Sequence, residues 1–518
     1  MKRRPHILIF QTDQLAAQAL GLYGGFAKTP NLESLARGGV VFENTYCNYP
    51  LCAPSRFSML TGQLATSIGA FDNAAQLPVD LPTFAHHLRR ADYRTCLSGK
   101  MHFIGPDQLH GFEERLTTDI YPADFAWLPN WESGNQAFAP IRNTIERGGV
   151  CAWNMQLAYD EDVTFQAVRK IYDFARKPSQ PFCLMVSLTH PHHPFLTTPS
   201  YWERYDHAAV PEPRVGRLPD EALDPHSRRC RRVIGLSESD VTTEDARAAR
   251  HAYYGSISYI DDKIAAVLAA LETAGMTEDT AIFVISDHGE MLGERGLWAK
   301  DCFFEWAMRI PLLVNLPGLS GGRRISNNVS LIDLLPTLLD LAEIDSAELS
   351  EPPAGQSLMG LLTGTADAWP DRVLAEYTAE AAEAPMVMIR QGAYKYIHSE
   401  DDPPLLYDLA TDPDELQNLA KDPEQEVRCK DFAREVAACW DLATLDSTIR
   451  LSQRRRALVG DAMARGDRDH WDYEPQPDYS RIYVRTASGS ELADRQIRVP
   501  AKGYELPGTS EGGGQGER

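Results

Sequence analysis

One cysteine of the nine in this chain begins a segment whose residue types suit nucleophilic attack on an anionic substrate. Cys52 is followed by Pro54, which the first turn of a helix tolerates, and then by Ser55 and Arg56. A helix that starts here directs its free N–H groups and the positive end of its dipole towards the anion. The alternative is that Cys52 is a small buried apolar residue. The surrounding pattern favours a covalent nucleophile.

Two pairs of potential metal ligands, Asp13-Gln14 and Asp287-His288, each follow a short apolar run. Because the carboxyl ends of parallel strands meet at one edge of a sheet, we expect these pairs to lie close together. Carboxylate and amide oxygens suit a hard divalent cation, and His288 offers a neutral nitrogen. Such a cation would polarise the substrate and the nucleophile. The alternative is that Asp and Gly here form ordinary turns.

Two lysines and a histidine offer further chemistry. Lys100 and His102 follow another apolar run, and an extended backbone would point both side chains to one side. A cation beside a proton carrier suits an anionic ester, and Lys300 could supply a second cation. The alternatives are solvated lysines and a histidine that is hydrogen-bonded in the core. The position after a predicted strand favours the site for Lys100 and His102.

The histidine-rich segment Thr-His-Pro-His-His-Pro at 189–194 could bind a metal on composition alone. Its two prolines restrict the backbone, so the three imidazoles are not expected to converge. His190 is nearest to the predicted strand end, and we predict that it protonates or positions the leaving oxygen. His192 and His193 are predicted to be structural or surface groups.

Apolar runs that stop abruptly at polar residues predict the strands that position these groups. The clearest runs cover 7–10, 93–97, 182–188 and 281–285. Unbroken runs of this length are typical of buried parallel strands. Apolar residues spaced three and four apart predict helices around 163–174 and 260–271. The alternation predicts an α/β fold, with a large mixed, mostly parallel sheet sandwiched by helices.

The pattern changes near residue 372 to closely spaced runs, which predict a small antiparallel sheet. These runs cover 373–377, 386–390, 394–398 and 405–409. A helix over 424–442 is expected to pack on this sheet. The last part is rich in charge and proline and predicts an extended arm with a disordered tip. We therefore expect a catalytic domain over 1–365, an α+β subdomain over 366–450 and an arm over 451–518.

Composition excludes several functions. The chain has 51 basic and 73 acidic residues and a formal charge of −22, which argues against general binding to nucleic acid or to anionic membranes. The nine cysteines lack disulfide or zinc spacing, which indicates a reducing compartment. The first apolar run is too short for a signal peptide, and none approaches the roughly 20 residues that cross a bilayer. We expect a soluble, cytoplasmic protein.

The pattern Cys-x-Pro-Ser-Arg-x-x-x-Leu-Thr-Gly at 52–62 resembles the sequence that is read by the machinery that oxidises a sulfatase cysteine to formylglycine. Over roughly residues 5–420 the chain resembles the formylglycine sulfatases of the alkaline-phosphatase-like superfamily, and the bacterial choline sulfatases most closely. The supporting runs are 47–59, 98–112, 116–125 and 289–298. The resemblance implies an aldehyde hydrate that attacks sulfur and then expels sulfate, and it implies formylglycine-generating machinery as a partner.

The resemblance also implies roles for the other candidates. Asp13, Gln14, Asp287 and His288 would hold calcium, or alternatively manganese or magnesium, beside oxidised Cys52. The nucleophile and the sulfate would be surrounded by Arg56, Lys100, His102, His190 and Lys300. His102 would remove the proton in hemiacetal breakdown, and His190 would assist the leaving alcohol. Sulfatases commonly have two acidic residues in place of Asp13-Gln14 and Asn in place of His288, which leaves the metal open.

A choline head group calls for an aromatic face and an anion. Positions that the subgroup uses correspond to Asn73, Trp127 and either Glu376 or Glu380. The alternatives are that Asn73 forms a turn, that Trp127 is a core residue and that the two glutamates are charges that face solvent. Where choline sulfatases have a Tyr-His-Asn run, this chain has Phe-Ala-Pro-Ile at 138–141. The alcohol therefore stays open.

The leading interpretation is hydrolysis of a small organic sulfate monoester such as choline sulfate. A phosphonate or phosphate mono- or diesterase on the same scaffold is the second. A non-catalytic binding protein with unmodified Cys52 is the third. We also expect a homo-oligomer, a dimer or tetramer, in which the C-terminal arm joins subunits or completes a neighbour's site. The aromatic residues of that arm are Trp471, Tyr473, Tyr479 and Tyr483.

Overall fold

An eight-stranded sheet forms the centre of the protein. The structure, a computed structural model, describes residues 4–133, 141–177, 179–237, 240–345, 347, 349–366 and 368–467. The strand order is β10-β2-β9-β8-β1-β6-β3-β4. The strands are β1 (His6–Asp13), β2 (Val40–Tyr46), β3 (Arg94–Gly99), β4 (Glu114–Arg115), β6 (Phe182–Pro191), β8 (Thr280–Ser286), β9 (Arg309–Asn315) and β10 (Arg323–Ser330). The strand β9 runs antiparallel to both its neighbours and the other pairs are parallel, so the expected mixed, mostly parallel sheet is confirmed.

The strand β1 shows why these sequences form buried strands. All eight of its residues are buried, with Ile7 and Ile9 in one core and Leu8 and Phe10 in the other. Both faces of a central parallel strand are covered, so its sequence is continuously apolar. The four predicted runs become β8, β1, β6 and β3, which are parallel neighbours in this order. Their carboxyl ends therefore share one edge of the sheet.

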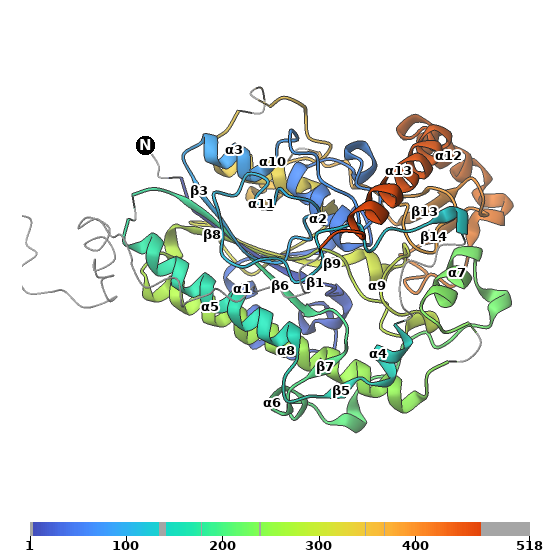
Figure 1. The fold of residues 1–518 in the computed structure, drawn as a ribbon, viewed down its shortest axis with the longest axis horizontal. Coiled ribbons are helices and arrows are strands. Elements are labelled where there is room, and N and C mark those ends of the chain that lie inside the picture. Colours follow the sequence, from blue (N-terminus) through green and yellow to red (C-terminus); the bar gives the residue numbers. More distant parts are fainter. Residues whose placement is uncertain are drawn as a thin grey trace, which may run out of the picture.

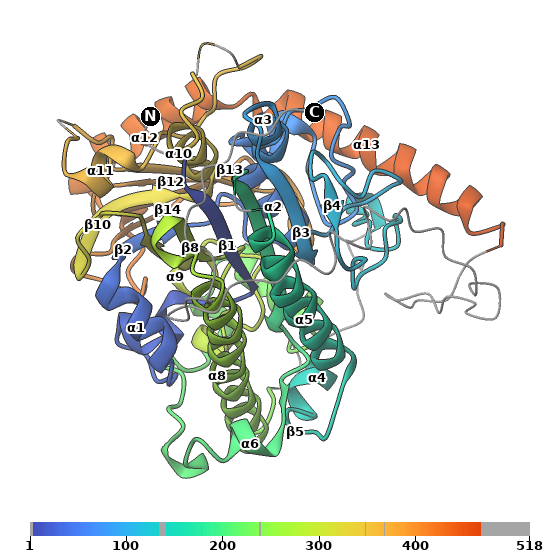
Figure 2. The same cartoon turned by 90° about the vertical axis from the view of Figure 1, so that its left-hand side faces the viewer.

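Helices cover both faces of the sheet (Figures 1 and 2). One face packs against α1 (Pro30–Gly38), α5 (Met155–Ala175) and α8 (Thr243–Thr273), and the other against α2 (Cys52–Thr61), α3 (Phe84–Arg90) and α10 (Leu334–Leu341). Both predicted helical patterns are confirmed, in α5 and α8. The shorter elements are α4 (Arg142–Glu146), α6 (Pro199–Trp202), α7 (Pro225–Val233), α9 (Glu305–Met308), α11 (Met359–Thr363), and the pair β5 (Gly149–Val150) and β7 (Leu196–Thr197).

A second, four-stranded antiparallel sheet follows, as expected. It contains β11 (Arg372–Tyr377), β12 (Met386–Gln391), β13 (Tyr394–Ser399) and β14 (Leu405–Asp408). The helix α12 (Glu426–Cys439) packs on it through Phe432 and Val436. None of the helices in the described residues is long and apolar enough to cross a bilayer.

The expected extended arm is wrong in the part that the structure describes. Helix α13 runs over Leu442–Met463, so the chain continues past residue 451 as a helix. Its Arg456 pairs with Asp72, and its Gln453 accepts from the backbone N–H of Trp131 (3.1 Å). These contacts tie α13 to the larger sheet domain. The predicted disordered tip and the aromatic residues of the arm lie outside the described residues.

Candidate active site

Cys52 is the first residue of α2, and all ten residues of this helix are buried. The residue before it, Leu51, is extended, so the chain turns sharply into the helix at the sheet edge. Cys52 is 1% exposed, and its Sγ lies 3.3 Å from Nε2 of His288 and 3.9 Å from Oδ1 of Asp13. The helix start thus delivers Cys52 to the polar groups at the strand ends, as its sequence predicts.

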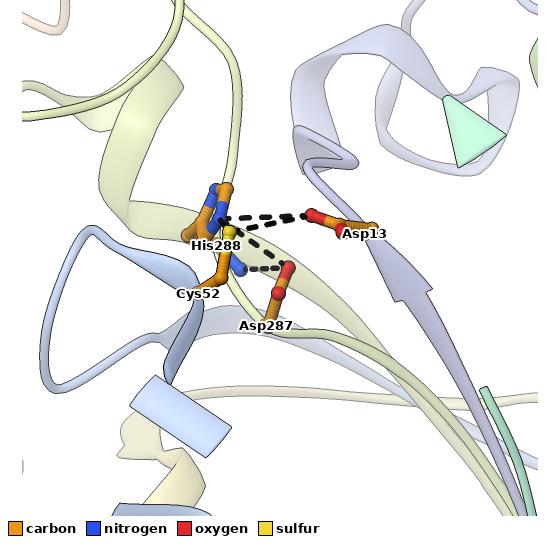
Figure 3. A group of neighbouring side chains, drawn as sticks. All are labelled: Asp13, Cys52, Asp287 and His288. Atoms are coloured by element: carbon orange, nitrogen blue, oxygen red, sulfur yellow. Dashed lines mark hydrogen bonds and ion pairs between the residues drawn. The ribbon is translucent and has the colours of Figure 1, made fainter. Parts of the chain in front are cut away.

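Asp13, Cys52, Asp287 and His288 form a cluster whose ligand atoms all lie within 4.8 Å of one another (Figure 3). Asp13 ends β1, and Asp287 and His288 follow β8, the neighbouring strand. Burial disfavours a charged Asp13, but Lys100 and the other nearby cations outweigh it and hold its pKa well below the usual value. Two buried carboxylates with a nitrogen donor fit a hard divalent cation.

Arg56 lies behind this cluster and does not line the cavity. Its Nε and Nη2 both lie 2.8 Å from Oδ2 of Asp287, and Nη1 donates to the carbonyl of Lys100 (2.7 Å) and to Ser187 (2.9 Å). The side chain is fully buried. Arg56 therefore orients the carboxylates next to Cys52, and its expected place around the nucleophile and the sulfate stays a prediction.

Lys100 and His102 follow β3, and both belong to the site. The ammonium of Lys100 contacts Oδ2 of Asp13 and lies 4.2 Å from the centre of the Tyr121 ring. Burial opposes the charge of Lys100, but Asp13 and the other acidic groups raise its pKa. Asp119 accepts from the backbone N–H of Met101 (2.9 Å) and of His102 (2.7 Å) and so fixes the turn.

Burial lowers the pKa of His102, although Cys52 nearby acts in the opposite direction. The imidazole is therefore neutral at pH 7. Within the described residues, neither ring nitrogen of His102 has a hydrogen-bond partner. A neutral imidazole with a free nitrogen next to Cys52 can accept a proton.

Lys300 and two histidines form the part of the site that faces the cavity. The ammonium of Lys300 donates to Oε1 of Gln14 (2.6 Å) and lies 3.2 Å from Nε2 of His192. His192 Nδ1 lies 2.6 Å from the carbonyl of His193, so Nδ1 carries the proton and Nε2 accepts from Lys300. Burial, with His193 and Lys300, holds the pKa of His192 well below its usual value. The side chain of Gln14 thus contacts Lys300, and its backbone N–H donates to Asp287 of the cluster in Figure 3 (3.0 Å).

The structure places His190 differently from the prediction. Oδ2 of Asp160, on α5, accepts from the backbone N–H of His190 (3.0 Å) and lies 2.6 Å from its Nδ1. These contacts turn the imidazole towards α5 and α8, where it packs 5.0 Å from the ring of Tyr259, and it does not line the cavity. His192 and His193 do line it. The prediction that His192 and His193 are structural or surface groups is therefore wrong, and His192 occupies the place foreseen for His190.

A cavity of about 580 Å³ opens in front of Cys52, a size typical of small-molecule sites. It is lined by residues of α2, α4, α5 and α7 and by the loops that carry Trp127, Lys300 and Glu380. Glu380 is 2% exposed, and neither of its carboxylate oxygens has a hydrogen-bond partner within the described residues. Burial, then the charge of Asp301, raises the pKa of Glu380 well above its usual value. Asp301 also lines the cavity and accepts from the hydroxyl of Tyr377 (3.1 Å).

The remaining candidates divide clearly. Asn73 and Trp127 line the cavity, and Asn73 Oδ1 accepts from the backbone N–H of Ala53 (3.0 Å). Glu376 does not, because its carboxylate accepts from Thr66 (2.8 and 2.6 Å) and from Nε1 of Trp440 (2.6 Å). Of the two glutamates, the structure therefore brings only Glu380 to the cavity. Of the variant run at 138–141, residues 138–140 lie outside the described residues.

Sequence reasoning missed three residues. His192 was discounted because prolines flank the segment, and Asp301 was hidden beside Lys300. Glu290, fully buried, contacts the amide of Gln14. A signal existed for Glu290, because a charged residue three positions after Asp287 in an otherwise apolar and glycine-rich stretch needs a buried partner.

The parallel sheet and the carboxylate, histidine and cysteine cluster at its edge define a hydrolase of the alkaline-phosphatase-like superfamily. A model of the sulfatase family matches residues 5–344, and models described as N-sulphoglucosamine sulphohydrolase, C-terminal, and choline sulfatase enzyme C terminal match 293–439 and 447–495. The chain belongs to the sulfatase family and is a sulfuric ester hydrolase.

Known proteins extend this similarity over nearly the whole chain. A choline-sulfatase of Rhizobium meliloti (strain 1021) is 41% identical over 508 residues, which are 96% of this chain and 99% of the relative. An arylsulfatase of Clostridium perfringens (strain 13 / Type A) is 29% identical and covers 84% and 93%. The solved phosphonate monoester hydrolase SpPMH of Silicibacter pomeroyi superposes with a TM-score of 0.68 at 26% identity, over 84% of this chain and 94% of that chain.

Proposed function

We propose that this enzyme hydrolyses the sulfate ester of a small cationic alcohol, choline sulfate in the first instance, through formylglycine made from Cys52. The observation that supports the alcohol is Glu380, a buried carboxylate without a partner in the described residues that lines the same cavity as Cys52. A buried anion of this kind needs a cation, and the aromatic ring of Trp127 offers the second feature that quaternary ammonium groups prefer.

In this scheme Sγ of Cys52 marks the position of the formylglycine hydrate oxygens. Asp13, Asp287 and His288, with the amide oxygen of Gln14 as a further ligand, would hold a divalent metal, and calcium is proposed ahead of manganese or magnesium. When bound, the metal polarises the sulfate and favours the ionised form of the hydrate. Lys100 pairs with Asp13 and holds its pKa well below the usual value, and Arg56 pairs with Asp287 (2.8 Å).

The side chains around the nucleophile divide the proton transfers. His102, neutral and with free ring nitrogens in the part of the chain that the structure describes, takes the hydroxyl proton when the sulfated hemiacetal collapses to the aldehyde and sulfate. Lys300 and His192 face the cavity from the opposite side. Lys300 balances charge on the sulfate oxygens and donates one ammonium proton to the leaving alcohol oxygen, while Nε2 of His192 accepts from another N–H of Lys300 and holds the ammonium in place. His190 positions the segment through Asp160 and takes no part in this step.

The proposed subsite for the alcohol contains Asn73, Trp127, Asp301 and Glu380. Each flank of Glu380 is fixed, since the carbonyl of Ala379 accepts from Nε1 of Trp131 (3.2 Å) and that of Ala381 from Nε of Arg229 (2.7 Å). Among the described residues, no lysine or arginine bonds to the carboxylate, so a cationic ligand in the cavity would stabilise its ionised form against the burial that raises its pKa. This arrangement selects for a positively charged alcohol.

The test is a comparison of kcat/KM over choline sulfate, an uncharged alkyl sulfate and an aryl sulfate. The proposal expects choline sulfate to be preferred by at least about tenfold, and equal values for the three esters would contradict it. Mass spectrometry of the tryptic peptide that contains Cys52 tests the nucleophile. An unmodified thiol in protein from the native host would contradict the formylglycine step and favour the non-catalytic binding protein.

A phosphonate or phosphodiester hydrolase is the second candidate, because the Asp-Gln and Asp-His pairs of the metal site occur in a fold similar to SpPMH. Faster turnover of an aryl phosphonate than of every sulfate ester would favour it. We also propose a homo-oligomer, a dimer or tetramer. A monomer in light scattering would contradict that proposal.

A further inference from the structure

Glu290 is a fully buried carboxylate that makes no contact with the cavity. Its Oε1 accepts from the backbone N–H of Leu292 (2.8 Å) and of Ala299 (2.6 Å), and its Oε2 accepts from Nε2 of Gln14. All three partners are N–H donors, so the carboxylate acts as an acceptor on both sides. The contact therefore decides which end of the Gln14 amide points towards Glu290.

The other end of the same amide faces the active site. Oε1 of Gln14 accepts from the ammonium of Lys300 (2.6 Å). The backbone of Gln14 cannot adjust, because its N–H donates to Asp287 (3.0 Å), its carbonyl accepts from Tyr253 (2.8 Å) and its φ is +67°. A rotation of the last side-chain bond is the remaining freedom, and it exchanges oxygen and NH₂.

We infer that Glu290 is a positioning residue that fixes the amide orientation of Gln14. Glu290 holds the NH₂ group, which also lies 3.3 Å from Nδ1 of His193, so the oxygen is presented to Lys300 and to the metal site next to it. The opposite orientation would place NH₂ against an ammonium and a metal cation, which is repulsive. The inference rests on the proposed function only where activity is measured, because metal binding and the position of Lys300 are independent of the alcohol.

An isosteric substitution isolates this role. In Glu290→Gln the two backbone N–H groups of Leu292 and Ala299 still require an acceptor, so the new amide keeps its oxygen there. Its NH₂ then faces Gln14, which must turn its own oxygen towards residue 290. Gln14 would present NH₂ to Lys300, with no change in the volume of either side chain.

A second substitution should reverse the effect. In the double variant, Gln14→Glu together with Glu290→Gln, one oxygen of the carboxylate introduced at position 14 accepts from the amide of residue 290, and the other faces Lys300. The number of negative charges is the same as in the natural protein. The single variant Gln14→Glu, by contrast, places two carboxylates against each other. The inference thus predicts two harmful single changes and a double change that recovers.

The experiment measures metal affinity by calcium and manganese titration of metal-free protein, with kcat and KM for the best sulfate ester beside it. We expect Glu290→Gln to lose about 10- to 100-fold in metal affinity, and kcat to fall in parallel. The double variant should return to within about fivefold of the natural protein. Glu294→Gln is the matched control, since its buried carboxylate also accepts two backbone N–H bonds (2.9 and 2.8 Å) outside the site.

Metal affinity unchanged in Glu290→Gln would overturn the inference, and so would a double variant no better than Glu290→Gln. Thermal melting of all variants in chelator separates a loss of folding from a loss of positioning, because the double variant would not rescue a fold that lacks the Glu290 carboxylate. If the preferred ester is not choline sulfate, the order of metal affinities is unaffected. Failure of the proposed alcohol is therefore distinguishable from failure of this inference.

Discussion

The two sides of the cavity are built differently. The nucleophile side, made of Asp13, Cys52, Asp287 and His288, lies on strand ends and a helix start, and its carboxylates are paired with Lys100 and Arg56. The leaving-group side, made of Asn73, Trp127, Asp301 and Glu380, lies on loops. On this side the carboxylate of Glu380 has no hydrogen-bond partner within the described residues.

Under the proposed function, the difference separates the part of the molecule that would carry out the reaction from the part that would select the substrate. Satisfied charges on rigid elements keep one geometry, which bond breaking at sulfur requires. An unsatisfied buried charge is unfavourable until a ligand neutralises it, so it discriminates between ligands. The following predictions test this division, beginning with the largest effect.

Replacing the nucleophile should have the largest effect. Cys52→Ala removes the atom that attacks sulfur and should lower kcat for every sulfate ester by more than about 10⁴-fold. Melting temperature and circular dichroism should stay near those of the natural protein, because the change removes only one small atom. Cys429→Ala, at a partly buried position in α12, is the matched control. Residual turnover above that level would place the nucleophile elsewhere.

Substitutions of His192 and of His190 should have the next largest effects, and these effects should differ in kind. His192→Ala removes the group beside Lys300 and should lower kcat for an alkyl sulfate by about 10²- to 10⁴-fold, and less for an aryl sulfate with a good leaving group. His190→Ala breaks the contact with Asp160 and should act mainly on thermal stability. If the loss in kcat depended on the leaving group equally in the two variants, the proton transfer would have to be assigned to His190 instead.

The charge on the leaving-group side should affect one substrate class only. Glu380→Gln should raise KM for choline sulfate by about 30-fold, or about 2 kcal/mol, because it removes the anion that meets the cation. KM for an uncharged aryl sulfate should change less than about threefold. Glu376→Gln is informative beside it, since that side chain bonds Thr66 and Trp440 and should affect stability instead. A similar rise in KM for both esters would show that Glu380 does not recognise the cation.

A pH dependence follows from the same residue. Burial and the charge of Asp301 raise the pKa of Glu380, so this carboxyl gains a proton at a higher pH than an ordinary glutamate. A cation binds the ionised form, and therefore KM for choline sulfate should rise as pH falls. The aryl sulfate should not show this rise, and Glu380→Gln should abolish the difference. Parallel pH profiles for both esters would contradict the assignment.

The smallest effect is expected at a contact that supports the leaving-group side from outside. Arg456 of α13 binds both carboxylate oxygens of Asp72 (2.5 and 2.7 Å), next to Asn73. Arg456→Ala leaves a buried carboxylate without this partner and should cost about 2 kcal/mol of stability and raise KM a few-fold. Arg454→Ala, at an exposed pair with Glu132, should cost less than about 0.5 kcal/mol. Urea unfolding measures both.

The sequence predicted the nucleophile side better than the leaving-group side for a physical reason. Asp13, Lys100 and Asp287 follow apolar runs, and parallel strands bring their carboxyl ends to one edge whatever the loops do. The strands, the principal helices and the small antiparallel sheet follow from the same periodic patterns. Position along a strand was thus enough to group residues that are hundreds of positions apart.

Loop conformation decided the rest. His190 and His192 are two positions apart, and only the contact with Asp160 on α5 determines which imidazole reaches the cavity. Glu376 and Glu380 are equally acidic, but Glu376 lies on β11 and is held by Thr66. The sequence of α13 predicts an extended arm because its charged residues hide a narrow buried stripe of Leu442, Ile449 and Gln453. Such side-chain partners have no local signal in one sequence.

The burial of α2 limits the time at which another enzyme could modify Cys52. All ten residues from Cys52 to Thr61 are buried, so a second protein cannot bind this segment once the helix has packed. If Cys52 becomes an aldehyde by the action of another enzyme, that enzyme must meet the segment while it is still unfolded, during or soon after synthesis on the ribosome. Folding would then end the period in which Cys52 can be modified. In that case a molecule that folds before it is modified would keep its Cys52 thiol. The folding rate would then determine what fraction of the protein becomes active.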